Sequence, residues 1–497
     1  MAVGTATTET EVLIVGTGFA GLGTAIRLAQ QGRRDFTIIE RADDVGGTWR
    51  DNTYPGLICD VPSHLYSFSF APNPDWSRTY PGQAEILRYL RVCADRYGVR
   101  RHIRFRSELT AARWDGASSR WHVETTTGSY NAHFLVLGMG AFSAPRMPAV
   151  PGLDIFAGTF FHSAAWRHDH DLRGERVAVI GTGASAIQFI PRIQPLVSRL
   201  LVLQRSPPWV LPHPGRRLTP AERWLSLRVP AVLHARRLGV YLIRETVVPG
   251  LVVDQRLNGG LEEVARRHLR HQVRDAGLRA TLTPQYRLGC KRMVLSNDFY
   301  PSLTRANVDV VAAPVVEVRE RSLVTGDGRE HEVDTIIAAT GFHVTDPPYA
   351  AQVAGRGGRT LAQTWDGSPN AYMATTVAGY PNLFVLSGPN SGIGHTSLVF
   401  MIEAQIDHVL DALDLCRRAR LSSIEVRPAA QAAFNADVQR RMRRTVWANG
   451  GCASWYYDAR GRNTTLWPAF TAQFAARARR IDVKAYRLTR SVAAAAA

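Results

Sequence analysis

Two glycine-rich turns, one near the N-terminus and one in the middle of the chain, have the spacing of dinucleotide-binding sites. In the first turn, Gly16, Gly18 and Gly21 follow the apolar run at residues 12–15 and precede apolar residues at helical spacing over 20–31. Such glycines permit a tight turn, close approach of the backbone to a pyrophosphate, and close packing of helix on strand. The pyrophosphate then lies at the helix N-terminus, where free N–H groups favour an anion.

An acidic residue stands where the first turn would need it for a ribose. Glu40 ends the next predicted strand, residues 36–39, about 20 residues past the turn. A carboxylate there can accept hydrogen bonds from both hydroxyls of an unphosphorylated ribose. Strand, turn, helix and acid together predict an adenine dinucleotide without a 2′-phosphate.

The second turn differs from the first in its charge. Gly181, Thr182, Gly183 and Ser185 follow the apolar run at residues 177–180. The strand after it ends in Arg205 and Ser206, where the first site has its carboxylate, and an arginine can pair with a 2′-phosphate through its planar fork. We therefore expect NADPH rather than NADH. Lys291 can add a second cation. The alternative is that Arg205 is one surface arginine among 58.

The pattern around each turn is repeated along the chain: turn, helix, β-meander, strand, closing glycine. Asp115-Gly116 and Asp327-Gly328 are the hairpin signals of the two meanders. The repeat predicts an α/β fold with two Rossmann-like dinucleotide-binding domains, each with a β-meander crossover. Two dinucleotide sites in one chain also predict that electrons pass from one dinucleotide to the other, with no separate reductase.

A stretch of different character lies inside the second half of the repeat, at about residues 208–287. Its segments read as amphipathic helices with arginine on the polar face. Helices packed over an active site are one interpretation, and binding to a membrane surface is the other.

Composition limits the remaining classes of function. The chain has 497 residues and a formal charge of +18, carried almost entirely by arginine. The arginines are scattered and no nucleic-acid-binding module is recognisable, so we expect a solvated basic surface and no nucleic-acid partner. The longest apolar runs are too short for an integral membrane segment. The tail from Ser491 is expected to fray.

Five widely spaced cysteines, at positions 59, 93, 290, 416 and 452, include no CxxC pair. We expect from them no metal site, no disulfide framework and no dithiol redox centre. This cysteine usage, and an N-terminus without a secretory signal, predict a cytoplasmic location.

Several motifs resemble those of one enzyme family, the type I Baeyer–Villiger monooxygenases. The segment FAGTFFHSAAW, with Phe156, Gly158, His162 and Trp166, resembles the family fingerprint FxGxxxHxxxW and lies between the two turns, as it does in the family. Arg167 departs from the proline or aspartate that usually follows. GGTWRDNTYPGLICD at residues 46–60 is similar to the second signature, and GCKR, AATGF, GYPNLF, GPNS and SWYYDARGRNTTLWP extend the resemblance over nearly the whole chain.

The resemblance implies FAD in the first site and NADPH in the second. The division it implies is an FAD-binding domain at residues 1–150 and 338–497, with an NADPH-binding domain at 151–337 that carries the helical insertion. Reduced FAD and O2 would give a C4a-peroxyflavin that converts a lipophilic ketone to an ester or lactone. The oligomeric state stays open.

The resemblance also implies residue roles. Arg292 matches the family's catalytic arginine, a cation that cannot protonate a peroxide anion. Asp60 matches the aspartate that positions it, and His162 with Trp166 would couple domain movement to the reaction. The residues expected to bind the cofactors are Gly16, Gly18, Gly21, Glu40, Gly47, Thr48, Trp49, Asp60, Tyr66, Gly181, Thr182, Gly183, Ser185, Arg205, Ser206 and Lys291.

Three other functions stay open at this point. A flavin-containing monooxygenase that oxygenates nitrogen or sulfur uses a neutral hydroperoxide and would not need Arg292. A catalytically silent flavoprotein and a plain NADPH oxidase are the others. Leu57 and Ile58, just before Asp60, stand where many family members have a small residue followed by arginine, which favours bulky hydrophobic substrates.

Overall fold

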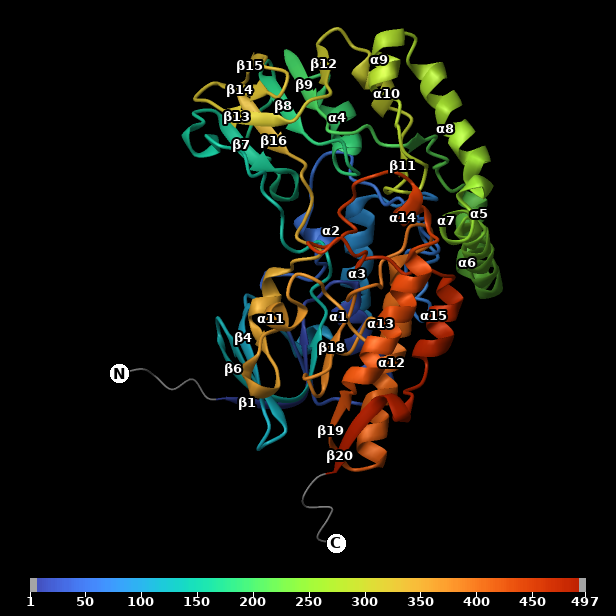
Figure 1. The fold of residues 1–497 in the computed structure, drawn as a ribbon. Helices are drawn as coiled ribbons and strands as arrows, with labels where there is room; N and C mark the ends of the chain where they lie inside the picture. The colour runs from blue at the N-terminus through green and yellow to red at the C-terminus, as the bar shows by residue number, and fades with distance from the viewer. Residues whose placement is uncertain (1–6, 491–497) are drawn as a thin grey trace.

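The structure is a computed structural model that describes residues 7–490. Two β-sheet units lie one above the other, and a row of helices follows their common outer edge (Figure 1). The tail predicted to fray from Ser491 lies outside the described residues.

The larger sheet contains the first glycine turn. Its strands run in the order β17-β4-β5-β6-β1-β2-β3, with β18 paired to β6. β1 is parallel to β2 and β6, whereas β4, β5 and β6 form the antiparallel meander. The strands are β1 (Thr8–Val15), β2 (Phe36–Ile39), β3 (Ile103–Arg104), β4 (Leu109–Asp115), β5 (Arg120–Thr125), β6 (Gly128–Leu137), β17 (Val353–Ala354) and β18 (Leu383–Val385).

Both faces of the larger sheet are buried, which explains its nearly continuous apolar strands. Successive side chains of a strand point to opposite faces, so Val12 and Ile14 of β1 enter one core while Leu13 and Val15 enter the other. Three helices cover the first face: α1 (Phe19–Gln30), α3 (Gln83–Arg96) and α12 (Leu398–Arg418). We call this sheet with these helices the eight-stranded unit.

The second sheet contains the second glycine turn and is parallel throughout, in the order β12-β9-β8-β16-β7. Its strands are β7 (Thr159–His162), β8 (Arg176–Ile180), β9 (Arg199–Leu203), β12 (Val308–Val311) and β16 (Thr335–Ala338). We call it, with α4 (Ala186–Ile193) and α10 (Phe299–Leu303), the five-stranded unit. The second meander, β13 (Val315–Val318), β14 (Ser322–Thr325) and β15 (Glu330–Glu332), forms a separate antiparallel sheet against it.

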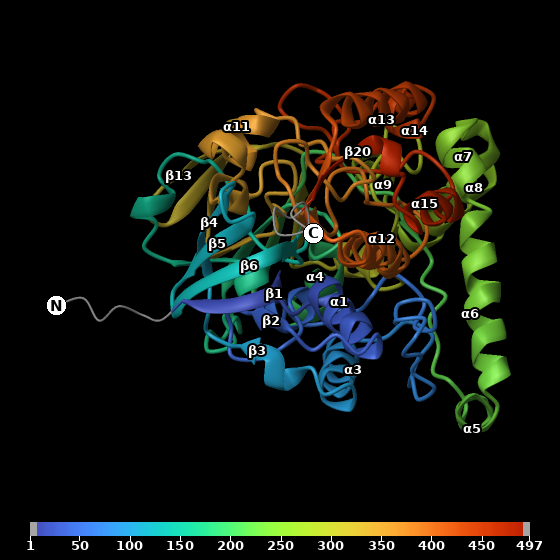
Figure 2. The ribbon, with the colours of Figure 1, turned by 90° about the horizontal axis from the view of Figure 1, so that it is seen from below.

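The predicted helical insertion forms the outer row of helices (Figures 1 and 2). It consists of α5 (Pro220–Arg228), α6 (Pro230–Glu245), α7 (Val248–Val252), α8 (Gly259–Gln272) and α9 (Ala276–Thr281). Two short parallel strands, β10 (Val210–Leu211) and β11 (Val294–Leu295), close its base. We call residues 220–281 the helical flank.

The remaining elements complete the eight-stranded unit and the connections. They are α2 (Thr48–Asp51), α11 (Leu361–Trp365), α13 (Pro428–Met442), α14 (Val446–Asn449), α15 (Thr471–Ala478), β19 (Leu421–Val426) and β20 (Tyr486–Arg490). The short 3-10 helices are Arg100–His102, Leu153–Ile155, Ser163–Ala165, Gln255–Asn258, Pro348–Ala351, Arg356–Gly358 and Val483–Ala485. Among the described helices, none is long and apolar enough to cross a membrane.

The chain passes between the two units through two segments that are paired with each other. Arg146 N donates to Gly341 O at 2.8 Å, and His343 N donates to Ala144 O at 2.9 Å. We call residues 144–146 and 341–343 the connector. The division of the chain at residues 150/151 and 337/338 stays a prediction.

Two of the five cysteines form a disulfide, which the expectation of no disulfide framework did not foresee. Cys290 and Cys452 are joined by a disulfide across 162 residues of sequence, with their Cα atoms 6.1 Å apart. They meet because residues 287–290 pack against the end of α14, where Arg287 N donates to Gly450 O. The cysteines at 59, 93 and 416 are free and buried. The argument from unpaired cysteines to a reducing compartment therefore loses part of its basis.

Candidate active site

The first glycine turn provides a surface made only of backbone at the N-terminus of α1. Gly16 has φ +96°, and a Cβ on Gly21 would lie 1.8 Å from Gly16 O, so neither position tolerates a side chain. Gly47, just before α2, closes the other side, because a Cβ there would lie 3.1 Å from Gly18 Cα. This cradle fits the pyrophosphate of a dinucleotide.

Glu40 is buried at the end of β2, with 4% of its surface exposed. Oε2 accepts from Thr17 N at 2.9 Å and Thr17 Oγ1 at 2.5 Å. Oε1 accepts from Ala42 N at 3.0 Å and pairs with Arg50 at 3.0 Å. The carboxylate is therefore oriented and charge-balanced before any ribose reaches it.

The predicted flavin-side aromatics lie next to the first turn. Trp49 Nε1 donates to Tyr66 Oη at 3.0 Å, and the Tyr66 ring packs edge-on against Phe19 at the start of α1, with centroids 5.1 Å apart. Burial raises the pKa of Tyr66 well above its usual value. Thr48, at the start of α2, is exposed.

The second glycine turn is more open. Gly181 has φ +108° and a Cβ on it would lie 2.7 Å from Ala339 O, whereas a Cβ on Gly183 would meet nothing within 4 Å. Thr182 is buried, and Ser185 is half-buried with no hydrogen bond that caps α4. The backbone at the start of α4 is thus accessible to a pyrophosphate.

Two cations, Arg205 and Lys291, lie close to each other at the end of the strand that follows the second turn. Lys291 Nζ donates to Ser206 Oγ, and it lies 5.1 Å from the centre of the Tyr286 ring. Burial, together with the charge of Arg205, lowers the pKa of Lys291 below its usual value. Arg205 itself is exposed. One guanidinium, one ammonium and one hydroxyl group form a site suited to a phosphate monoester.

Arg292 and Asp60, 232 residues apart in sequence, form an ion pair. Arg292 Nε donates to Asp60 Oδ2 at 2.8 Å, and Nη2 lies 2.7 Å from the same oxygen. Nη1 donates to Ile393 O at 3.1 Å. The pKa of Arg292 is raised, mainly by the charge of Asp60. With 31% of its side chain exposed, Arg292 retains two N–H groups for a reactant.

Sequence reasoning missed two residues that lie beside this ion pair. Arg244 of α6 donates from Nη2 to Asp60 O at 3.3 Å and to Tyr80 Oη at 3.0 Å. Tyr456 is 2% exposed, and burial, beside Arg292 and Asp60, raises its pKa to about 12. Tyr456 could have been found within SWYYD. Arg244 carries no local signal that separates it from the other arginines of the flank.

His162 and Trp166 lie at the end of β7, next to the connector. His162 is buried, its Nδ1 accepts from Ala164 N at 3.1 Å, and its Nε2 has no hydrogen-bond partner among the described residues. Burial lowers its pKa. Trp166 packs against Phe161 and against Phe189 of α4, with centroids 5.3 and 5.2 Å apart. Neither side chain forms a hydrogen bond or an ion pair with Arg292 or Asp60.

The loop that carries Asp60 is fixed to the five-stranded unit through α4. Gln188 Oε1 accepts from Tyr54 Oη at 3.2 Å, and Gln188 Nε2 donates to Ile58 O at 2.9 Å. Tyr54 also packs edge-on against Phe189, which contacts Trp166. The fingerprint tryptophan and the loop of Asp60 therefore share one neighbouring helix.

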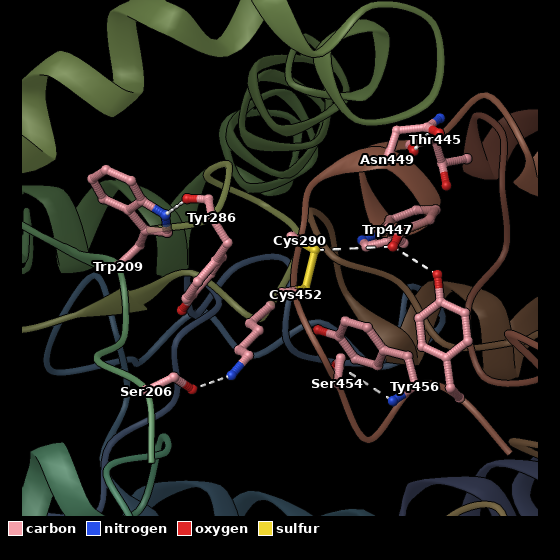
Figure 3. Close-up of a disulfide and its surroundings, with 12 residues drawn as sticks. Ser206, Trp209, Tyr286, Cys290, Thr445, Trp447, Asn449, Cys452, Ser454 and Tyr456 are labelled. Carbon is pink, nitrogen blue, oxygen red and sulfur yellow. Dashed lines mark hydrogen bonds between the residues drawn. A yellow bond between two sulfur atoms is a disulfide. The ribbon is translucent and has the colours of Figure 1, made fainter. Parts of the chain in front are cut away.

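The disulfide lies directly before Lys291 and Arg292 in the sequence. Figure 3 shows Cys290 joined to Cys452, with Ser206 and Tyr286 on one side and Trp447 and Tyr456 on the other. Tyr457 Oη donates to Trp447 O at 2.6 Å in the same segment. The position of Cys290 directly before Lys291 and Arg292 was the signal in the sequence that this cysteine belongs to the site.

The comparisons with known proteins agree with this site. Residues 9–354 match the family model described as flavin-binding monooxygenase-like. A Baeyer–Villiger monooxygenase of Streptomyces coelicolor is 50% identical over 480 residues, which covers 96% of this chain and 92% of that protein.

Two solved structures cover nearly the whole chain. A steroid monooxygenase bound to NADP is similar with a TM-score of 0.84 at 31% identity, covering 97% of this chain and 100% of that one. OTEMO in complex with FAD and NADP is similar with a TM-score of 0.86 at 26% identity, covering 97% of this chain and 99% of that one.

These findings confirm three predictions: the two-Rossmann α/β fold, the pair of cofactors, and a flavoprotein monooxygenase. The residue assignments are not tested by similarity of whole chains, and they stay predictions supported by the geometry above. With the family model over residues 9–354 and the relative at 50% identity, the chain belongs to the flavin-binding monooxygenase-like family, and within it to the Baeyer–Villiger monooxygenases.

Proposed function

We propose that this protein uses FAD, NADPH and O2 to convert a lipophilic ketone to an ester or lactone. The observation that supports the proposal most is the Arg292–Asp60 pair, a permanently charged guanidinium close to Tyr66 on the side of the first turn and directly after Lys291 on the side of the second. When bound, FAD would be reduced by NADPH and would supply an activated oxygen atom for insertion beside the carbonyl. Both cradles belong to one chain, so no separate reductase is needed.

Arg292 would act by charge and by hydrogen-bond donation. Asp60 and Ile393 O hold three of its five N–H groups, which leaves two in fixed directions. A preorganised cation of this kind stabilises an anionic oxygen without reorganising during the reaction. Its raised pKa means that it cannot donate a proton to that oxygen. Asp60 would be the positioning residue, and Arg244 would hold the loop of Asp60 in place.

The lipophilic character of the substrate rests on the loop that leads to Asp60. Leu57 and Ile58 are half-buried there, and neither brings a charge to the site. His162 and Trp166 would couple movement of the five-stranded unit to the reaction. His162 packs against Phe342 of the connector, and Trp166 packs against Phe189 of α4. A cytoplasmic location stays a prediction that three free, buried cysteines support.

The test is product analysis of Arg292→Ala with NADPH, O2 and a panel of ketones, one sulfide and one tertiary amine. We expect ester formation to fall by at least about 100-fold, the loss typical of one removed oxyanion donor, while reduction of FAD by NADPH persists. Arg113→Ala, at an exposed arginine of β4, is the matched control. Ester formation that survives in Arg292→Ala would contradict the role of Arg292. Oxygenated amine and sulfide with every ketone untouched by the unmodified protein would instead favour the nitrogen- or sulfur-oxygenating alternative.

A further inference from the structure

The large apolar side chains exposed to solvent gather on the helical flank and the residues next to it. Among the described residues, nine of the seventeen exposed large hydrophobic side chains fall between positions 224 and 264, with 37–69% of each exposed. They are Trp224, Leu227, Val229, Leu238, Leu242, Ile243, Val253, Leu257 and Val264. Single exposed apolar residues are normal, but a cluster of this size marks an interaction surface.

Helix α6 shows that this exposure belongs to one face. Its inner face is fixed: Arg237 Nη1 donates to Ser67 O at 2.8 Å, and Tyr241 stacks on Phe400 with centroids 5.0 Å apart. Its outer face carries Leu238 and Leu242 one turn apart, with Ile243 beside them, all more than half exposed. Figures 1 and 2 show α5, α6, α7 and α8 along the same outer edge in two perpendicular views.

The flank is also strongly basic. Residues 208–287 contain fourteen arginines, no lysine and six acidic residues. The acids near the apolar cluster are engaged: Glu222 pairs with Arg216, and Glu263 pairs with Arg267 and Arg270. Asp254 is bonded to the backbone of its own short helix. Exposed Arg228, Arg256 and Arg274 form no ion pair with any described residue. The net charge beside the apolar cluster is therefore positive.

We propose that the helical flank docks this protein on the surface of an anionic lipid bilayer. An amphipathic helix with apolar residues on one side and arginine at the border lies in the headgroup region, where burial and attraction to anionic lipid add. A second copy of the chain would bring arginine against arginine across a two-fold axis, so charge complementarity favours the lipid. This docking proposal rests on the exposure and charge of the flank and does not depend on which reaction the protein catalyses.

The flank also reaches the active site from its inner side. Arg244 of α6 donates to Asp60 O, and Leu251 of α7 lies against Gly289, directly before Cys290. A bilayer against the outer face would therefore lie one helix layer from the Arg292–Asp60 pair. A lipophilic substrate dissolved in that bilayer would meet the enzyme at this layer rather than in bulk water.

The experiment is co-sedimentation of the FAD-bound protein with vesicles. One set contains phosphatidylcholine alone, and the other contains about a third phosphatidylglycerol. We expect binding to the anionic vesicles only, weakening as salt is raised. The variant Leu238→Gln/Leu242→Gln/Ile243→Gln should bind at least about tenfold more weakly, since it removes three exposed aliphatic side chains that would be buried in the bilayer. Arg228→Glu/Arg256→Glu should lose most of the anionic preference.

The control is Val92→Gln/Ile155→Gln, which removes two exposed apolar side chains outside the flank and should bind as the unmodified protein does. FAD content and NADPH oxidation without vesicles verify that every variant is folded. Equal binding by the flank variant and the control would overturn the proposal. So would a dimer, measured by light scattering, that the flank variant converts to monomer without any vesicle binding by the unmodified protein.

Discussion

The two predicted dinucleotide sites share the same kind of glycine turn. They differ in the burial, and in the hydrogen-bond partners within the protein, of the residue expected to recognise the ribose. At the first, the predicted ribose-binding residue Glu40 is buried, and its carboxylate already accepts from Thr17 and Ala42 and pairs with Arg50. At the second, the recognition residue Arg205 is exposed, and its companion Lys291 reaches it from a distant segment. A buried, preorganised site retains its ligand, whereas an open, cationic one attracts an anion quickly and releases it. The difference matches a resident flavin and an exchanging nicotinamide.

The largest effect should come from Glu40→Ala. The change removes a buried acceptor and leaves Arg50, Thr17 and Ala42 without their partner, and each unmade buried hydrogen bond costs about 1–3 kcal/mol. We expect purified protein without bound FAD, measured as the ratio of flavin to protein absorbance. Glu124→Ala, at an exposed carboxylate of β5, should keep its FAD. A yellow Glu40→Ala protein would mean that the two cradles do not differ in the way described.

The second largest effect should come from Arg205→Ala. Loss of the exposed guanidinium should raise the KM for NADPH by about 100-fold, as expected for a charged hydrogen bond to a phosphate. The KM for NADH should stay nearly unchanged, which makes NADH the internal control. Initial rates with both cofactors measure this. An equal rise for NADPH and NADH would show that Arg205 does not contact a 2′-phosphate.

Lys291→Ala should have a smaller effect in the same direction. Lysine is a point charge without the fork of arginine, and Lys291 already donates to Ser206. We expect the KM for NADPH to rise by about tenfold, with FAD content unchanged. A loss of FAD in this variant would indicate that Lys291 supports the first dinucleotide site and not the second.

The smallest effect should be a dependence of NADPH binding on alkaline pH. Burial and Arg205 lower the pKa of Lys291, so its positive charge is lost at a lower pH than that of an ordinary lysine. NADPH binding should therefore weaken as pH rises toward 10, since a neutral amine no longer attracts the phosphate. The KM for NADPH measured against pH reports this. Lys291→Arg should abolish the slope, and NADH should show none.

Sequence reasoning succeeded where the interacting residues are close in sequence, and it failed where they are far apart. Both glycine turns and the residues at the strand ends after them were predictable, because a turn, a helix start and the next strand lie within about 30 residues. The Arg292–Asp60 pair joins residues 232 apart, and only the family resemblance indicated it. Nothing in the sequence indicated that Arg244 holds the loop of Asp60, or that Cys452 lies beside Cys290. Such contacts depend on how the flank and α14 pack.

The disulfide changes the mechanics of the molecule. The connector joins the two units through one paired strip of backbone, and Gln188 of α4 adds side-chain hydrogen bonds to the loop of Asp60. Cys290 and Cys452 add a covalent link between the segment that leads to β11 and the segment after α14. A preparation with this bond intact and one kept in strong reductant therefore differ in whether residues 290 and 452 are covalently joined. The thiol state of a sample has to be fixed before rates of cofactor exchange are compared.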